Sequence, residues 1–269
     1  MTDVITSEII DQEICLIKLN RPDTLNSLNK TLVDSLYNSI DECEKNDSIR
    51  SIILTGNGRG FCAGADLANG GWPTEDGWSA GKATANAMEI GFNPLVRKIV
   101  NSKKPVINAI NGIAAGGGVG LALCGDIVIA SEKAKFKLVF GPQLGIIPDV
   151  GASWLVPNLI GRAKANGLAL LGDDLDAKQA CDWGLIWQVV KDEDLLPEAI
   201  KIAKRIANSA ITGLKAVVKA HDKALVSTLD EQLNYERDTQ EIFCNKDEFK
   251  EGVRAFLEKR KPNFKDIKN

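Results

Sequence analysis

The glycine run Gly116-Gly117-Gly118 most limits what this chain can fold into, because it opens a helix of small residues between two short apolar segments. Glycine has no Cβ, so the backbone at such a run can approach a ligand closely. The N–H groups at a helix start also lack intrahelical partners, and they can bind an anion or a developing oxyanion. Glycine runs are more often plain turns or close packing sites, so the rest of the chain must decide.

Short β-rich segments alternate with segments of helical periodicity along most of the chain. Apolar, β-rich runs predict strands at 14–19, 51–54, 105–110, 126–130 and 135–140. Apolar residues at three- and four-residue spacing predict helices at 28–44, 80–100, 117–124, 155–171, 177–183, 197–208 and 213–224. Together they predict an α/β core over residues 1–200 and a helical segment over 201–269, which ends in a charged amphipathic stretch at 230–259.

The segment from Ala68 to Ser79, ANGGWPTEDGWS, interrupts this pattern with glycine, proline and two tryptophans. We expect a loop here, since glycine and proline favour turns. Such a loop often shapes a ligand pocket, but it is equally compatible with a surface excursion that has no function.

Composition excludes several classes of protein. The chain carries a net charge of −3, whereas nucleic-acid binders usually present a basic field to phosphates. It has no run near the roughly 18 apolar residues that a membrane span needs. Its six cysteines lack CxxC spacing, which argues against a disulfide framework and against a structural zinc site. We therefore expect a cytoplasmic protein with no metal, no nucleic-acid partner and no membrane span.

The chain has a single histidine, His221, within an expected helix. A Ser-His-Asp triad, a Cys-His pair or a multi-histidine metal site would each depend on this one residue, which is better explained as a surface or packing side chain. Acid–base chemistry must therefore use carboxylates first. Asp149 is one candidate, because it lies on a second glycine-flanked turn.

Five ordered motifs make the chain similar to a known family. They are LNRPDTLNSL from residue 19, GRGFCAGADL from 58, NAINGIAAGGGVGLALCGDIVIAS from 108, GIIPDVGASWLVPNLIGRAKA from 145 and EGVRAFLEKRKPNF from 251. In this order they resemble the crotonase (enoyl-CoA hydratase/isomerase) superfamily. The resemblance implies a crotonase-like spiral of strand-strand-helix repeats with a C-terminal helical trimerisation segment. It also implies acyl-CoA thioester substrates, no cofactor beyond the CoA of the substrate, and a homotrimer or dimer of trimers.

The resemblance also assigns site residues. It implies an oxyanion hole in which the backbone N–H groups of Ala63 and Gly117 donate to the thioester carbonyl and stabilise an enolate. Asp126, in the CGD motif, is interpreted as structural. The residues that the resemblance places near the substrate or its CoA moiety are Thr24, Leu25, Arg59, Asp66, Leu67, Gly116 and Lys259.

Carboxylates distinguish the members of this superfamily. Hydratases use two glutamates, but this chain has Gly120 at the first position and Gln143 near the second. An isomerase needs one carboxylate that removes a proton and returns it at another carbon, and Asp149 matches that acid in family isomerases. Three further runs are GIIPDVGASWLVPNLIGRAKANGLALLGDDLDA from residue 145, ACDWGLIWQVV from 180 and the tail LDEQLNYERDTQ…EFKEGVRAFLEKR from 229. Within the superfamily, they most resemble 2-(1,2-epoxy-1,2-dihydrophenyl)acetyl-CoA isomerases of phenylacetate degradation. This similarity implies conversion of a ring epoxide to an oxepin, shifts of enoyl-CoA double bonds, or both.

Local sequence suits Asp149 to act as a base. Its neighbours Ile146, Ile147, Val150 and Trp154 are expected to desolvate the carboxylate and to raise its pKa. The alternative is that Asp149 is only the N-cap of the following helix, which would add about 1 kcal/mol of stability.

Two other functions stay open. One is a hydratase that takes its acid from elsewhere, for example from Glu75 and Asp76. The other is a non-catalytic acyl-CoA-binding protein that keeps the oxyanion glycines without the chemistry.

Overall fold

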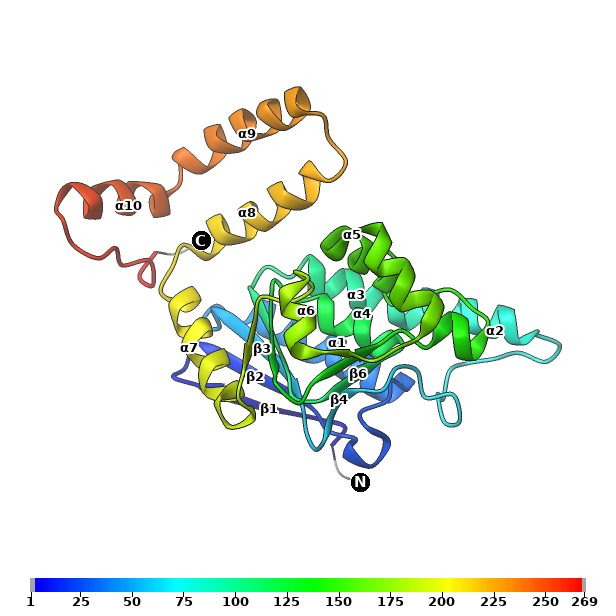
Figure 1. Ribbon diagram of the computed structural model, residues 1–269. Coiled ribbons are helices and arrows are strands. Elements are labelled where there is room, and N and C mark those ends of the chain that lie inside the picture. The colour runs from blue at the N-terminus through cyan, green and yellow to red at the C-terminus, as the bar shows by residue number, and fades with distance from the viewer. Residues whose placement is uncertain (1–2, 268–269) are drawn as a thin grey trace.

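The larger of two sheets has six strands in the order β1-β2-β3-β5-β7-β10, in a computed structural model that describes residues 3–267 (Figure 1). The strands are β1 Ile5–Ile10, β2 Ile14–Leu19, β3 Ser51–Gly56, β5 Val106–Ile110, β7 Ile127–Ser131 and β10 Gln188–Val190. Neighbouring strands from β2 to β10 are parallel, whereas β1 pairs with β2 in an antiparallel hairpin.

A smaller sheet of four short strands, in the order β4-β6-β8-β9, completes the core. Its strands are β4 Gly60–Cys62, β6 Ile113–Ala115, β8 Lys135–Lys137 and β9 Leu175–Asp176. Along the chain, β3, β5 and β7 are each followed by one strand of the smaller sheet and then by a helix. The chain thus passes through both sheets once in each strand-strand-helix unit.

Helices cover both faces of the larger sheet. The helices of the core are α1 Lys30–Lys45, α2 Ala80–Ala87, α3 Asn93–Val100, α4 Gly117–Leu123, α5 Ala152–Leu171, α6 Ala177–Asp182 and α7 Leu195–Ala207. Residues of α1, α3 and α4 pack on one face with strand residues such as Ile17 and Leu54. Residues of α7 pack on the other face against Leu16 and Ile53. Both faces are buried, so the parallel strands are apolar along most of their length.

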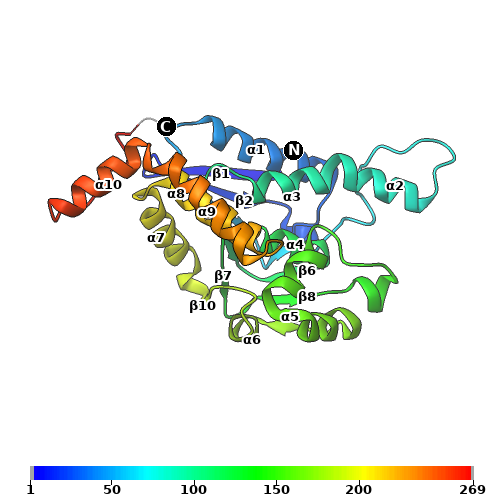
Figure 2. The ribbon, with the colours of Figure 1, turned by 90° about the horizontal axis from the view of Figure 1, so that it is seen from above.

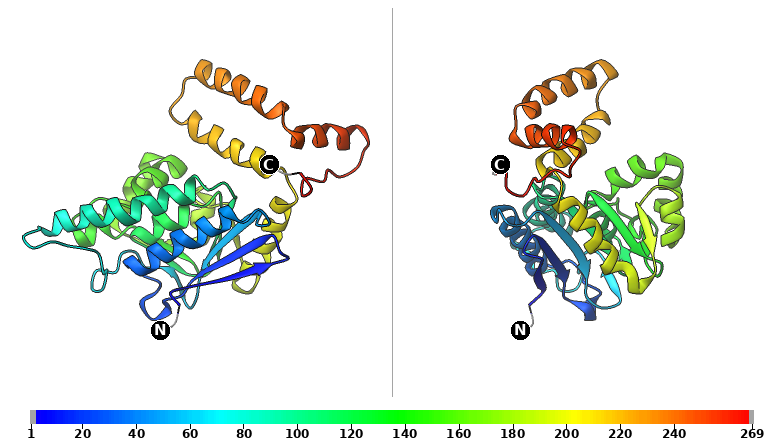
Figure 3. Two further views of the ribbon diagram at one scale, coloured as in Figure 1. Left: turned by 180° about the vertical axis from the view of Figure 1, so that it is seen from behind. Right: turned by 90° about the vertical axis from the view of Figure 1, so that its left-hand side faces the viewer.

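Three further helices form an arm that projects from the core, on the side away from α2 (Figures 1 and 2). They are α8 Ile211–Ala224, α9 Leu229–Cys244 and α10 Asp247–Leu257. Views from behind and from the side show the same projection (Figure 3). The Lys215 ammonium on α8 lies 2.6 Å from the Asp126 carboxylate of the core. The predicted boundary after residue 200 falls inside α7, which packs on the larger sheet, whereas the arm begins at α8. The division into two domains stays a prediction.

The predicted α/β class is confirmed, with several local differences. The edge strand β1 was not predicted, and it forms because it can pair with β2. The expected strand 135–140 ends at Lys137 and is followed by a π-helical turn, Phe140–Leu144. The expected helix 80–100 is two helices joined by a second π-helical turn, Met88–Phe92. Among residues 3–267, no helix is both long enough and apolar enough to cross a bilayer.

Candidate active site

A cavity of about 410 Å³ brings together four segments of the chain. They are the turn after β4, the loop 68–79 with α2, the start of α4, and the segment from Val139 to Asp149. The loop 68–79 therefore shapes a pocket. The predicted site residues that line this cavity are Ala63, Asp66, Leu67, Gly116, Gly117 and Asp149.

The turn after β4 and the start of α4 contact each other through bare backbone. A β carbon built on Gly64 would lie 3.1 Å from the Gly117 nitrogen and 2.8 Å from the Ala115 oxygen. Gly64 also has a φ of +92°, which disfavours residues with a side chain. Glycine at position 64 thus allows both turns to face the same cavity.

The N–H of Gly117 is available to a ligand, whereas that of Ala63 is not. Gly117 is the first residue of α4, where an N–H has no partner within the helix. The Ala63 N–H donates to the Leu25 carbonyl at 2.9 Å. The prediction that Ala63 supplies an open donor is therefore wrong, because the turn after β4 uses that N–H to hold the segment before α1 that contains Leu25.

Ala65 offers the open donor that the sequence did not identify. The Leu28 N–H donates to Gly64 at 2.7 Å, and the Asp66 N–H donates to Leu28 at 3.0 Å. These bonds fix the peptides on both sides of Ala65. Within the described part of the chain, the Ala65 N–H has no protein acceptor, and the residue is exposed to the cavity. Ala65 and Gly117 thus both line the cavity, and neither N–H is used by the hydrogen bonds that hold the two turns.

Asp149 lies directly beside Gly117. A β carbon built on Gly117 would lie 3.3 Å from Asp149 Oδ1. Burial raises the pKa of this carboxyl, as predicted, although a hydrogen bond from its own backbone partly opposes the shift. Helix α5 begins at Ala152 with Gly151 as its N-cap and with no side-chain cap. Asp149 is therefore not the N-cap, and the capping alternative is excluded.

Only part of the predicted apolar surrounding of Asp149 is present. Val150 is buried, and Ile146 lines the same cavity as the carboxylate. Ile147 is 80% exposed, and Trp154 lines a different cavity. Of the four predicted neighbours, Val150 alone is buried and Ile146 alone shares the cavity with the carboxylate.

Asp66 is the second carboxylate of the cavity, and it is already paired. The Arg21 guanidinium lies 2.8 Å from its carboxylate, and the Asn69 N–H donates to it at 2.8 Å. Burial opposes ionisation of Asp66, but these two partners hold the pKa of its carboxyl below the usual value. Asp149 is thus the one cavity carboxylate that no side-chain cation neutralises.

The positions that would carry hydratase glutamates do not offer a second acid. A β carbon at Gly120 would lie 2.8 Å from the Val150 carbonyl carbon, with the carbonyl oxygen closer still. Gln143 is exposed on the π-helical turn Phe140–Leu144 and does not line the cavity. Glu75 and Asp76 are exposed on the loop and do not line it either.

The remaining predicted CoA contacts lie outside the cavity. Thr24 lines a separate surface pocket beside Arg21, and Leu25 provides the carbonyl that binds Ala63. Arg59 is exposed between β3 and β4. Lys259 is exposed just after α10, on the arm that projects on the side away from α2 (Figure 1), and it does not line the cavity.

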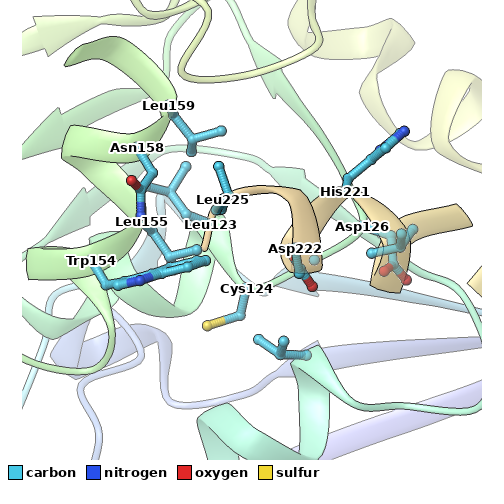
Figure 4. A pocket seen from close by; sticks show the side chains of 13 residues that line it. Leu123, Cys124, Asp126, Trp154, Leu155, Asn158, Leu159, His221, Asp222 and Leu225 are labelled. Carbon is cyan, nitrogen blue, oxygen red and sulfur yellow. The ribbon is translucent and has the colours of Figure 1, made fainter. Parts of the chain in front are cut away.

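A second cavity, of about 340 Å³, lies between α4, α5 and α8. His221 is exposed at its edge, and its imidazole points away from the leucines that line this cavity (Figure 4). The Asp126 carboxylate accepts from Lys215 and from the Val106 N–H, which supports its structural interpretation. Over residues 3–267, no group of three or more His, Cys, Asp or Glu side chains could hold a metal ion.

Comparison with known proteins agrees with this fold. The enoyl-CoA hydratase/isomerase family model matches residues 9–268. A 1,2-epoxyphenylacetyl-CoA isomerase from Escherichia coli (strain K12) is 45% identical over 255 residues, which cover 95% of this chain and 96% of the relative. A probable enoyl-CoA hydratase from Rhodobacter capsulatus is 36% identical, with 95% of each chain covered. The crystal structure of an enoyl-CoA hydratase from Bacillus anthracis superposes with a TM-score of 0.88 at 32% identity, covering 97% of this chain and 99% of that one.

The chain therefore belongs to the enoyl-CoA hydratase/isomerase family. Proteins of this family act on acyl-CoA thioesters. The predicted resemblance, both to the family and to the isomerase within it, is confirmed.

Proposed function

We propose that this protein is an acyl-CoA isomerase that uses Asp149 as its single proton shuttle. The observation that carries the proposal is the placement of Asp149 beside Gly117, in a cavity whose other carboxylate is held by Arg21. An isomerisation needs one carboxylate, because the proton that it removes is the proton that it returns.

The proposed reaction has two steps. The N–H groups of Ala65 and Gly117 donate to the thioester oxygen, while the Asp149 carboxylate removes a proton from a carbon next to the carbonyl. The electron pair of the broken C–H bond moves into the enolate, whose negative charge the two N–H groups stabilise. Asp149 then delivers the proton to a carbon further along the conjugated system, so the double bond moves and no atom is gained or lost.

The proposed substrates are enoyl-CoA thioesters, whose double bond shifts as described, and a ring-epoxide phenylacetyl-CoA, which is converted to the oxepin. In the ring substrate the C–C bond between the two epoxide carbons also breaks, its electrons join the ring double bonds, and the proton removed beside the thioester returns to a ring carbon. The 45% identity to the isomerase from E. coli supports the ring substrate. Hydration is the alternative, supported by the names of relatives such as the protein from R. capsulatus. Hydration is less favoured, because the Val150 backbone leaves no room for a side chain at position 120, and Gln143 is exposed to solvent. Neither position can therefore supply the second acid that hydration needs.

The oligomeric state, the cofactor requirement and the cellular location are part of the same proposal. We propose a homotrimer or a dimer of trimers, in which the arm of one protomer brings Lys259 to the CoA of a neighbour. Exposed apolar side chains on the arm, such as Leu233, Phe249 and Phe256, support this packing. The proposed chemistry draws on no cofactor beyond the CoA of the substrate. The scattered cysteines favour a cytoplasmic location.

Purified protein offered a 3-enoyl-CoA and crotonyl-CoA in parallel tests the proposal. We expect the double bond of the 3-enoyl-CoA to move into conjugation, with little hydration of crotonyl-CoA. Rapid hydration without a double-bond shift would contradict the isomerase. If the protein bound both thioesters and turned over neither, the non-catalytic binding function would replace it.

A further inference from the structure

Trp72 connects the loop 68–79 to the inner end of the active-site cavity. Its side chain is half-buried, packs against the main hydrophobic core and lines the same cavity as Asp149. Its ring forms an edge-to-face pair with Phe92, with centroids 4.8 Å apart and an interplanar angle of 60°. Such pairs add roughly 0.5–1.5 kcal/mol beyond the burial of their area.

The backbone at two glycines, Gly70 and Gly91, packs closely against opposite edges of the indole. A β carbon on Gly70 would lie 2.8 Å from Trp72 Cδ1 and 3.2 Å from Nε1, on the five-membered ring. A β carbon on Gly91 would lie closer than 3.0 Å to Cη2 and Cζ3, on the six-membered ring. Neither position can carry a side chain while the indole stays where it is. Trp72 is therefore clamped between the loop and the helical segment that follows it.

The backbone around the clamp is fixed at both ends. The Gly70 carbonyl accepts from the Lys30 N–H at the start of α1, at 2.8 Å. Gly91 and Phe92 belong to the π-helical turn between α2 and α3. A π-helical turn changes the direction in which later residues of a helix point, and such turns are frequent at functional sites. Within this turn, the backbone of Gly91 and the ring of Phe92 both contact the indole.

Phe92, the more deeply buried member of the aromatic pair, lies on the buried side of the cavity. Phe92 and Ala87 are 4% and 5% exposed, whereas Leu67 and Ile146, which line the same cavity, are 79% and 49% exposed. An acyl group that enters past the exposed side chains therefore ends against Trp72 and Phe92.

We propose that Trp72, clamped by Gly70 and Gly91, is the specificity-determining residue of this site and selects planar ring acyl groups over extended chains. The inference rests on the proposed acyl-CoA function, since it concerns the acyl end of the same cavity. A planar ring can form edge or face contacts with the indole and with Phe92, and a flexible chain gains less from them. The indole also closes the space that a longer chain would need.

The test compares isomerisation of 1-cyclohexenylacetyl-CoA, 3-hexenoyl-CoA and 3-decenoyl-CoA by the wild-type protein and by Trp72→Ala. The first is the ring substrate, in which the four ring carbons around the double bond lie in one plane. We expect kcat/KM for the ring substrate to fall about tenfold, to fall much less for 3-hexenoyl-CoA, and to rise for 3-decenoyl-CoA. Trp78→Ala is the matched control, because Trp78 lies in the same loop, contacts Lys82 and does not line the cavity. An equal fall for all three substrates, or the same change in Trp78→Ala, overturns the inference.

Gly91→Ala tests the clamp without removing the indole. The new methyl group must displace Trp72, so the preference for the ring substrate should fall as it does in Trp72→Ala. The loss of thermal stability caused by Gly91→Ala should largely disappear in the double variant with Trp72→Ala, where the ring is absent. Unchanged ring preference in Gly91→Ala, with the indole displaced, would rule the clamp out.

A binding measurement separates this inference from the proposed function. Calorimetry with phenylacetyl-CoA and hexanoyl-CoA needs no turnover. The wild-type protein should favour phenylacetyl-CoA, and Trp72→Ala should lose that preference. If no substrate is isomerised but this difference in binding is found, the isomerase proposal fails, whereas the role of Trp72 in selecting ring acyl groups is supported. If all substrates are isomerised but Trp72→Ala does not change the binding preference, the isomerase proposal is supported and the role of Trp72 in specificity is rejected.

Discussion

The Asp149 carboxylate faces the backbone of Gly117, at 3.3 Å from the point where a β carbon of residue 117 would lie. In the proposed reaction, a substrate carbonyl bound at the Gly117 N–H would have its neighbouring carbon close to this carboxylate. The same closeness means that any side chain at position 117 would fill the space between base and substrate.

Replacing the base should strongly reduce turnover while leaving the fold intact. We expect Asp149→Asn to lower the rate of 3-enoyl-CoA isomerisation by about 10²–10⁴, the usual contribution of a positioned base. Stability should not fall, because Asp149 caps no helix. Steady-state kinetics and a melting curve check both points. A variant that keeps more than a tenth of the activity would show that another group moves the proton.

The raised pKa of Asp149 predicts a pH-dependent cost to stability. In the folded protein this carboxyl keeps its proton at pH values where the unfolded chain, with a pKa near 3.9, has lost it. Stability relative to Asp149→Asn should thus fall as pH rises from about 4 through the folded pKa, and then stay constant. Urea unfolding of both proteins at several pH values measures this difference. A gap that is the same at pH 4 and pH 7 would contradict the assigned burial.

Position 120 should be unable to accept a side chain. In Gly120→Ala the new methyl group meets the Val150 carbonyl, so we expect a loss of about 2–3 kcal/mol or more. Gly167→Ala in α5 is the control, since no heavy atom lies within 4 Å of its β carbon and helix propensity favours alanine by up to about 1 kcal/mol. Urea unfolding of the two variants should show opposite signs. Equal stabilities would mean that the turn at Val150 can move, and the hydratase would regain support.

Backbone substitution can separate the two alanines after β4. Replacing Ala65 by lactic acid removes its N–H and makes the Gly64 carbonyl, which accepts from the Leu28 N–H, a weaker ester acceptor. We expect kcat to fall by about 10²–10³, with a loss of stability of no more than about 1 kcal/mol. The same replacement at Ala63 removes the hydrogen bond to Leu25, so it should cost about 1 kcal/mol of stability and leave kcat nearly unchanged. The reverse pattern would restore Ala63 as the donor.

The buried ion pair between Lys215 and Asp126 should hold the start of the arm. Their side chains are 7% and 10% exposed, and Lys215→Met would leave the carboxylate buried without its cation. We expect a loss of about 3–5 kcal/mol in urea unfolding. Lys219→Met, on an exposed turn of the same helix, should change stability by less than about 0.5 kcal/mol. Comparable effects at both positions would argue against a special role for the pair.

Local pattern was enough for many elements of the fold. The strand predicted at 14–19 is β2 with the same bounds, and the helix predicted at 117–124 ends one residue earlier, at Leu123. These predictions succeed because burial on one or both faces of an element imposes a periodicity that is visible within a few residues. The motifs also identified Gly117 and Asp149, which the structure places side by side.

The sequence by itself thus determined the α/β class, the family and the residue types of the site. Only the tertiary structure decided which backbone N–H groups are open. Ala63 and Ala65 are alike in sequence, but Leu25 binds the first and Leu28 holds the peptides around the second. It also decided that Gly120 is closed by Val150 and that Trp72 lies between Gly70 and Gly91. The physical reason is that hydrogen-bond partners and free space at a site are supplied by residues distant in the chain, which no local pattern records.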